Sequence, residues 1–358
     1  MAKMVIDPWS SNIPEDYKKI ADKFGLEKFN IEEFPEPNLL MSRGIVFSGR
    51  DLKIISKCIK EKKPFYVLTG IMPTADKLHF GTKSVIDQVI YFQKNGAETY
   101  VLVADLEAAA TRGISLKEAK KRAMEIHIPC YIALGLDPKK TKFYFQSEND
   151  EVRNLSYVLS RKATLNEYKA IYGNAEPARI MSSILQVSDI LHPQLKKKMP
   201  GIIPIGIDQD PHIRLSRDIA KRAHEFNFFL PSSIYHKFVP DLSGNLKMSK
   251  SEGNSLYLLD TDEEIKKKVS KALTGGQKTL DEQKKKGGNP DKDMLFELFK
   301  QHLITDDKEL EKRIKDYKSG KILDSENKEY AIKLLQKYMK DFREKYNEAR
   351  KDVDKYLD

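Results

Sequence analysis

The sequence predicts an α/β protein in which a Rossmann-like, doubly wound parallel sheet is followed by a helical C-terminal domain. Two observations predict this fold class. From residue 64 to residue 257, short β-prone apolar runs alternate with longer segments of helical periodicity, which is typical of βαβ units. After residue 257 the β-prone runs disappear and charged helical segments replace them. We therefore expect an N-terminal extension at 1–60, a Rossmann-like domain at 61–257 and a helical domain at 258–358.

The expected strands are short runs of apolar and β-branched residues. The first of them, at 65–69, is stopped by Gly70 and Pro73, which disfavour regular strand structure. The strands are expected at 65–69, 99–104, 142–146 and 202–207. Residues 1 to about 50 mix acidic and aromatic residues with prolines, and we expect helices and irregular chain there.

Helices are expected between these strands and after them. Ser115, with Glu118 three residues later, is a plausible N-cap, and Asp210 followed by Pro211 has the same character. In the Rossmann-like region, helices are expected around 85–92 and at 115–134, 151–171, 180–191 and 210–224. In the C-terminal region, they are expected at 263–273, 294–303, 308–317 and 330–356.

Charge and cysteine content limit the class of protein. The 358 residues carry 63 Lys and Arg against 53 Asp and Glu, a net charge of +10. This balance favours a polyanionic partner but is equally typical of a charged, solvated surface. Cys58 and Cys130 form no metal-type pair and no disulfide framework, which predicts a reducing compartment. There is no apolar signal region at 1–12 and no apolar run near the roughly 20 residues of a membrane helix, so we expect a cytoplasmic protein.

The first candidate motif occupies residues 70–82, between the first expected strand and helix. A glycine-containing loop at this position gathers free backbone N–H groups and the positive end of a helix, which together bind anions. His79 can donate to a phosphate, and Gly81 permits close approach of an adenine or ribose. Taken alone, so short a motif is equally typical of a tight turn with an ordinary loop histidine.

The second candidate motif is Lys-Met-Ser-Lys-Ser at 247–251. Lys247 and Lys250 place two ammonium groups three residues apart on a loop, where they can stabilise the charge of a departing pyrophosphate. A solvated basic loop is the commoner meaning of such a cluster. Both motifs in this order, one near the start and one at the end of the sheet-forming region, favour the catalytic interpretation.

These residues resemble a known enzyme family. Residues 247–251 match the KMSKS motif of class I aminoacyl-tRNA synthetases, and His79-Phe80-Gly81-Thr82 resembles the partner motif HIGH, with Thr82 in place of the last histidine. Residues 206–211 closely resemble the Gly-x-Asp-Gln-Asp-Pro stretch of archaeal and eukaryotic tryptophanyl-tRNA synthetases. Tyrosyl enzymes tend to carry Glu-Gln-Arg-Lys there. The resemblance extends from about residue 64 to residue 291.

The resemblance implies that the protein activates L-tryptophan with ATP and transfers it to the 3′-terminal adenosine of tRNA(Trp). The implied catalytic residues are Lys247, Ser249, Lys250, His79 and Thr82. The implied ATP-binding residues are Gly70, Pro73, His79, Gly81, Thr82, Gly206, Asp208, Met248 and Lys250. The implied substrate-binding residues are Leu68, Glu107, Gln186, Asp189 and Gln209. With no metal-binding cluster in the sequence, Mg²⁺ is expected on the phosphates of ATP.

The expected helix at 180–191 bears on the choice of amino acid. Ser182, Gln186 and Asp189 share one face, which either meets solvent or lines a polar pocket. In the family this helix lines the amino-acid pocket, and bacterial tryptophanyl enzymes place an aspartate at the matching position to accept the indole N–H. The resemblance therefore implies that Asp189 recognises indole. The Tyr and Gln that read indole in eukaryotic-type enzymes correspond to Leu68 and Leu102 here.

The resemblance also implies a homodimer and a tRNA-binding role for the C-terminal helices. Basic runs at 196–198, 266–268 and 284–286 are candidate tRNA contacts, although each is also typical of a solvated face. A tyrosyl enzyme is the nearest alternative. The others are a non-catalytic RNA-binding paralogue and a nucleotidyltransferase for another small acceptor.

Overall fold

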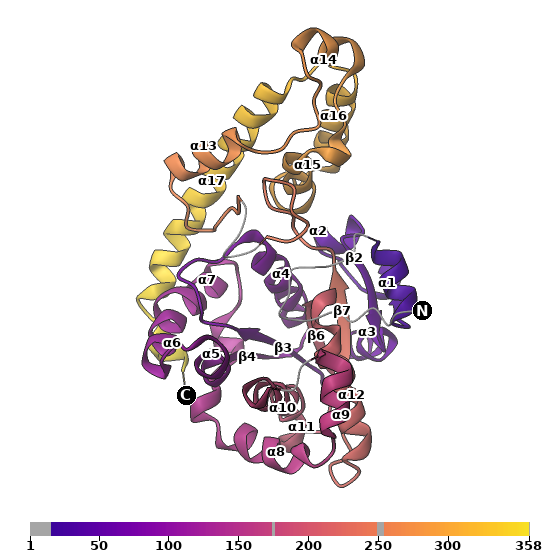
Figure 1. The fold of residues 1–358 in the computed structure, drawn as a ribbon, viewed down its shortest axis with the longest axis vertical. Helices are drawn as coiled ribbons and strands as arrows, with labels where there is room; N and C mark the ends of the chain where they lie inside the picture. Colours follow the sequence, from indigo (N-terminus) through magenta and orange to yellow (C-terminus); the bar gives the residue numbers. More distant parts are fainter. Residues whose placement is uncertain (1–15, 174–175, 249–253, 358) are drawn as a thin grey trace.

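The computed structural model describes residues 16–173, 176–248 and 254–357, and it places a seven-stranded sheet at the centre of the molecule (Figure 1). The strands are β1 (Glu27–Lys28), β2 (Val46–Arg50), β3 (Tyr66–Ile71), β4 (Glu98–Val103), β5 (Thr141–Phe145), β6 (Gly201–Gly206) and β7 (Ser232–His236). Their order is β1-β2-β7-β6-β3-β4-β5, and the five strands from β7 to β5 are parallel. This confirms the predicted fold class and the four predicted strands.

Strands β1, β2 and β7 were not predicted. β2 lies antiparallel to β7, and β1 lies antiparallel to β2, so part of the N-terminal region extends the sheet. The expectation of only helices and irregular chain before residue 50 was therefore wrong. At Gly49 a β-carbon would lie 2.6 Å from the carbonyl oxygen of Ser233 on β7, so the close pairing of the two strands requires glycine there.

Helices cover both faces of the sheet. Along β3 and β4, Val67 and Val101 pack against one layer, while Leu68 and Leu102 pack against the other, as the two-residue period of a strand requires. The first layer is built mainly from α4 (Phe80–Lys94) and α7 (Ile128–Ala133), and α6 (Leu116–Arg122) leads into it through residues 123–127. The second is built mainly from α8 (Asp150–Ser160), α9 (Leu165–Tyr172), α10 (Pro177–Leu191), α11 (Pro193–Lys196) and α12 (Asp210–Arg222).

The helix predictions for this region are confirmed with three differences. The predicted helix at 151–171 forms two helices, α8 and α9, which are separated at 161–164. The predicted helix at 115–134 contains a π-helical turn, Ala123–His127, between α6 and α7. Asp210 is the first residue of α12 and does not act as its N-cap, which is Gln209. The Asp210 carboxylate instead accepts hydrogen bonds from Arg50 and Tyr235, so its side chain is held by the sheet. The remaining helices here are α1 (Tyr17–Lys23), α2 (Leu39–Ser42), α3 (Leu52–Lys60) and α5 (Asp105–Arg112).

The C-terminal region is helical, as predicted. It consists of α13 (Asp262–Ser270), α14 (Leu280–Lys286), α15 (Met294–Leu298), a π-helical segment (Phe299–Leu303), α16 (Asp307–Lys318) and α17 (Asp324–Arg350). The 27-residue α17 runs from these helices back along α7, and the C-terminus ends beside β5, where Leu357 bridges to Phe143 (Figure 1). One continuous hydrophobic core joins the sheet to these helices. No helix in the described part of the chain is long and apolar enough to cross a membrane.

Candidate active site

A cavity of about 260 Å³ lies at the carboxyl ends of β3 and β6, where open α/β sheets bind ligands. It brings together residues from both candidate motifs and from the loop after β6. The sequence-predicted residues that line it are Gly70, His79, Gly81, Thr82, Gly206, Asp208, Gln209, Lys247 and Met248. Pro73 is buried just after β3 and is not among the lining residues. Ser249 and Lys250 lie outside the described residues.

The first motif forms the start of α4. His79 occupies the N-cap position, and the helix begins at Phe80, so the backbone N–H groups of the first turn point toward the cavity end of the sheet. A β-carbon at Gly81 would lie 2.9 Å from Nδ1 of His79, which explains why this position holds glycine. The arrangement offers an anion the positive end of a 15-residue helix.

The second motif approaches the loop after β6. Nζ of Lys247 lies 2.6 Å from Oδ2 of Asp208, whose side chain is buried, and it lies over the ring of Phe238. Gln209 donates a second hydrogen bond to the same carboxylate at 3.0 Å. The cavity therefore presents one cation and one carboxylate from segments almost 40 residues apart in the chain.

The sequence did not predict His236 and Phe238, which also line this cavity. His236 is the last residue of β7, and burial lowers its pKa to about 4, so its imidazole is neutral at physiological pH. No described residue hydrogen-bonds its buried Nδ1. A position at the carboxyl end of a parallel strand would have indicated His236 as a site residue, but β7 was not predicted from the sequence.

The backbone at Gly206 lies so close to its neighbours in this cavity that a side chain would not fit. A β-carbon there would lie 2.6 Å from Oδ1 of Asp208 and 2.7 Å from Cε1 of Phe238. Because the sequence resemblance implies ATP binding in this cavity, we expect Gly206→Ala to displace the Asp208 carboxylate and to raise the KM for ATP by at least about tenfold, since an ångström-scale misplacement can cost about 100-fold. Steady-state kinetics over a range of ATP concentrations would measure this. An unchanged KM for ATP in a variant with the wild-type melting temperature would contradict the close fit.

A second cavity, of about 350 Å³, adjoins the first and shares Thr69, Gly70, Met72, Gly206 and Gln209 with it. Its apolar walls are Leu68, Leu102, Ile190 and Ile203, and its polar lining includes Glu107, Gln186, Gln209 and Gln146. Four of the five predicted substrate-binding residues, Leu68, Glu107, Gln186 and Gln209, thus lie around one cavity.

Asp189 is the fifth predicted substrate-binding residue, and it is not among the residues that line either cavity. It is fully buried on α10. Its Oδ1 accepts a hydrogen bond from the Tyr144 hydroxyl at 2.9 Å, and its Oδ2 accepts one from Nε2 of Gln146 at 2.7 Å. Burial raises the pKa of Asp189 to about 8, and these two hydrogen bonds oppose that rise. The polar face of α10 therefore meets the protein interior and not solvent.

A metal site was not expected from the sequence. Within residues 16–173, 176–248 and 254–357, no three His, Cys, Asp or Glu side chains are grouped so that they could hold a metal ion. The residues that line the two cavities offer anion binding, charge stabilisation and the binding of an apolar side chain beside the anion site.

Comparison with known proteins gives the family. The family model described as class I tRNA synthetases (W and Y) matches residues 60–340. A tryptophan–tRNA ligase of Methanocaldococcus jannaschii is 39% identical over 100% of this chain and 99% of its own length. The crystal structure of a tryptophanyl-tRNA synthetase from Aeropyrum pernix, 39% identical, aligns with a TM-score of 0.91 over 98% of this chain and 99% of that one. An Encephalitozoon cuniculi tryptophanyl-tRNA synthetase, solved with tryptophan, is 30% identical and aligns with a TM-score of 0.85 over 97% and 98% of the two chains. On this sequence and structural evidence, the chain belongs to the class I tRNA synthetases of the tryptophanyl and tyrosyl family.

Proposed function

We propose that this protein activates L-tryptophan with ATP to tryptophanyl-adenylate and transfers the tryptophanyl group to the 3′-terminal adenosine of tRNA(Trp). The observation that carries the proposal is the pair of adjoining cavities at the carboxyl ends of β3 and β6. One is lined by both motifs and offers anion-binding groups. The other is lined by apolar walls and by the polar side chains of Glu107, Gln186 and Gln146. The relatives named tryptophan–tRNA ligase support tryptophan over tyrosine.

ATP would occupy the first cavity. The N-terminus of α4, with His79 and Thr82, would hold phosphates, while Gly70, Gly81, Gly206 and the Met248 backbone would leave space for adenosine and contact it. Pro73 would shape the loop after β3. Asp208, whose Oδ2 is paired with Lys247, would accept hydrogen bonds from the ribose hydroxyls. Mg²⁺ would enter on the phosphates of ATP and neutralise part of their charge.

Tryptophan would occupy the second cavity, with its ring against the apolar walls that include Leu68 and Leu102. Glu107, Gln186 and Gln209, which line this cavity, would bind its amino and carboxylate ends. The carboxylate would attack the α-phosphate in line and release pyrophosphate, a reaction in which positioning and charge stabilisation supply the catalysis. Lys247 would stabilise the pyrophosphate, together with Ser249 and Lys250 of the same motif.

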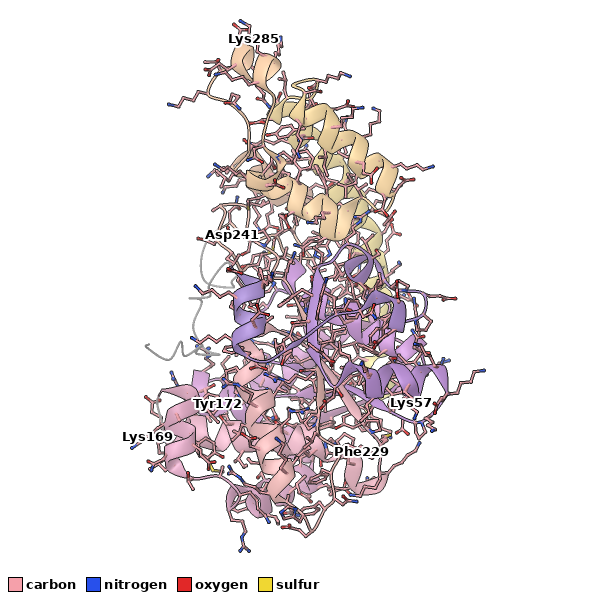
Figure 2. The ribbon with its side chains drawn as sticks, turned by 90° about the vertical axis from the view of Figure 1, so that its right-hand side faces the viewer. Lys57, Lys169, Tyr172, Phe229, Asp241 and Lys285 are labelled. Carbon is pink, nitrogen blue, oxygen red and sulfur yellow. The ribbon has the colours of Figure 1, made fainter. Side chains whose placement is uncertain are left out.

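The C-terminal helices are the proposed tRNA-binding region. Three consecutive lysines, 284–286, end α14, and Figure 2 shows Lys285 at the extreme tip of the molecule. The basic run at 196–198 is less available, because Lys196 and Lys197 pair with Glu151 and Glu98 and Lys198 donates to a backbone carbonyl. In the run at 266–268, Lys268 pairs with buried Asp260. In α14, Lys286 forms an exposed pair with Glu282 at 3.5 Å, and the position of the run at the tip of the molecule favours α14 as the site that meets the phosphate backbone.

Homodimerisation is supported by large apolar side chains exposed on neighbouring helices. Tyr157 and Val158 on α8, Leu165 on α9 and Met181 on α10 are 74%, 44%, 53% and 53% exposed. We expect Tyr157→Lys to shift the protein from dimer to monomer at micromolar concentration, as measured by light scattering during size-exclusion chromatography. Leu280→Lys, on α14 at the opposite end of the molecule (Figure 1), is the control and should leave the mass unchanged. A wild-type monomer would contradict the proposal.

A cytoplasmic location is also proposed, and the two free cysteines, Cys58 and Cys130, support it.

Charging of tRNA tests the proposed function as a whole. Purified protein, ATP, Mg²⁺ and labelled tryptophan would be incubated with a tRNA(Trp) transcript, and acid-precipitable label would be counted. The proposal predicts charging of tRNA(Trp) that disappears when the terminal adenosine is removed. Tight binding of the transcript without charging would support the alternative of a non-catalytic RNA-binding paralogue.

A further inference from the structure

The second cavity contains a buried hydrogen-bond acceptor to which none of the described residues supplies a donor. Gln146 directly follows β5, is only 1% exposed and lines the cavity. No described residue donates to its Oε1, which is itself buried. A buried polar atom without a partner is destabilising, and in a ligand cavity it marks a place where the ligand supplies the missing group.

The orientation of this amide is fixed by its neighbours. Nε2 of Gln146 donates to Oδ2 of Asp189 at 2.7 Å, and Tyr144 donates to the other oxygen of that carboxylate at 2.9 Å. Because both carboxyl oxygens of Asp189 accept these hydrogen bonds, the NH₂ group of the amide faces Asp189 and the amide oxygen is left for another donor. Tyr144 and Gln146 both come from the β5 end, whereas Asp189 is on α10.

The backbone around Gln146 is held as well. Arg153 donates to the Gln146 carbonyl oxygen at 3.1 Å. The next residue, Ser147, donates from its backbone N–H to buried Asp105 at 3.1 Å, and its hydroxyl donates to the same carboxylate. The acceptor therefore sits on a backbone fixed from two sides, which is the preorganisation that selective recognition requires.

The ligand that fits this acceptor is a large apolar ring with one N–H donor. Leu68, Leu102 and Ile190 line the same cavity and offer only hydrocarbon. An indole satisfies both conditions, because its surface is apolar except for a single N–H group.

Resting on the proposed function, we propose that Oε1 of Gln146 accepts the hydrogen bond of the indole N–H, and that Asp189 and Tyr144 are positioning residues that orient the Gln146 amide. Asp189 thus acts on the choice of amino acid through Gln146, and not by direct contact with the indole. A site with a fixed acceptor rejects an analogue that lacks the donor, since the acceptor is then left unpaired.

The test compares tryptophan with 3-(3-benzothienyl)alanine, in which sulfur replaces the indole N–H with little change of shape. ATP–pyrophosphate exchange would give kcat and KM for both compounds in the wild-type protein and in Gln146→Met. We expect the wild-type protein to prefer tryptophan in kcat/KM. Gln146→Met should lower kcat/KM for tryptophan by roughly 10- to 100-fold, mainly through KM, and should change the value for the analogue much less.

Further variants separate recognition from positioning and from general damage. Asp189→Asn and Tyr144→Phe should each reduce the preference for tryptophan, but less than Gln146→Met does. Ser188→Ala, at a buried neighbour on α10 whose hydroxyl donates to the Ile184 carbonyl oxygen, should leave the preference unchanged. Gln146→Ala, which puts no new group beside Asp189, replaces Gln146→Met if the latter does not fold.

The outcomes distinguish this inference from the proposed function. Exchange with tryptophan in the wild-type protein, together with an unaltered preference in both Gln146 variants, would overturn the inference and leave the function intact. Loss of the preference in Asp189→Asn but not in the Gln146 variants would also overturn it and assign the indole contact to Asp189. A wild-type protein without exchange on tryptophan would contradict the proposed function itself.

Discussion

Replacing Lys247 with alanine is expected to lower kcat for ATP–pyrophosphate exchange by about 10²–10³-fold, the usual effect of removing one preorganised group that stabilises transition-state charge. Lys247 lines the first cavity, and its Nζ lies 2.6 Å from Asp208. Because its proposed partner is the departing pyrophosphate, the loss should appear in kcat far more than in the KM for tryptophan. Initial exchange rates at saturating ATP and tryptophan would measure it.

Lys221→Ala is the matched control for this prediction. Lys221 lies near the end of α12, on the surface, and it is paired only loosely with Asp218 at 4.0 Å. Such an exposed pair contributes little, so we expect the rate to stay within about twofold of wild type. An undiminished kcat in Lys247→Ala would show that the cation beside Asp208 has no part in catalysis.

Replacing Asp210 with alanine is expected to destabilise the folded protein by about 3–5 kcal/mol, the usual cost of removing one partner from a buried ion pair. The Asp210 side chain is completely buried. It accepts hydrogen bonds from Arg50 at 2.9 Å and Tyr235 at 2.5 Å, and Arg214 lies 3.0 Å away. Without Asp210, the largely buried Arg50 guanidinium keeps its charge and loses its carboxylate. Urea unfolding monitored by circular dichroism would measure the change.

Asp262→Ala is the control for that measurement. Its ion pair with Arg343, at 3.1 Å, joins two side chains that are both partly exposed, and we expect a loss below about 1 kcal/mol. Equal effects of the two substitutions would contradict the role of Asp210 as the anchor that ties β2 and β7 to the start of α12. That anchor matters for function because Asp208 and Gln209 directly precede it.

The parts of the fold that could be predicted were those with local signals. Strands β3, β4, β5 and β6 lie inside the sheet or carry continuous apolar runs, so their sequences alone were sufficient. Strand β2 contains Gly49 and Arg50, and β7 begins with two serines, so neither has such a run. The two strands pair with each other across almost 190 residues of chain, as Val46 does with His236. The pairing of β2 with β7 is a tertiary interaction, so it cannot be predicted from any short stretch of the sequence.

The same distinction holds for the candidate site. Motif spacing predicted Gly81, Asp208 and Lys247 as site residues, because each belongs to a short contiguous motif. Gln146 and His236 are isolated residues at strand ends, without a motif around them. The hydrogen-bond partners of Asp189 could not be predicted either, because they are two residues at the end of β5 that lie more than 40 positions away in the sequence.

The central claim is that the two adjoining cavities bind ATP and tryptophan for adenylate formation, and ATP–pyrophosphate exchange tests it most directly. Purified protein would be given tryptophan and tyrosine in separate reactions, with ATP, Mg²⁺ and labelled pyrophosphate. We predict exchange that depends on tryptophan and is absent or far weaker with tyrosine at the same concentration. Comparable exchange with tyrosine would contradict the assignment of the amino acid, and exchange with neither would contradict the catalytic account.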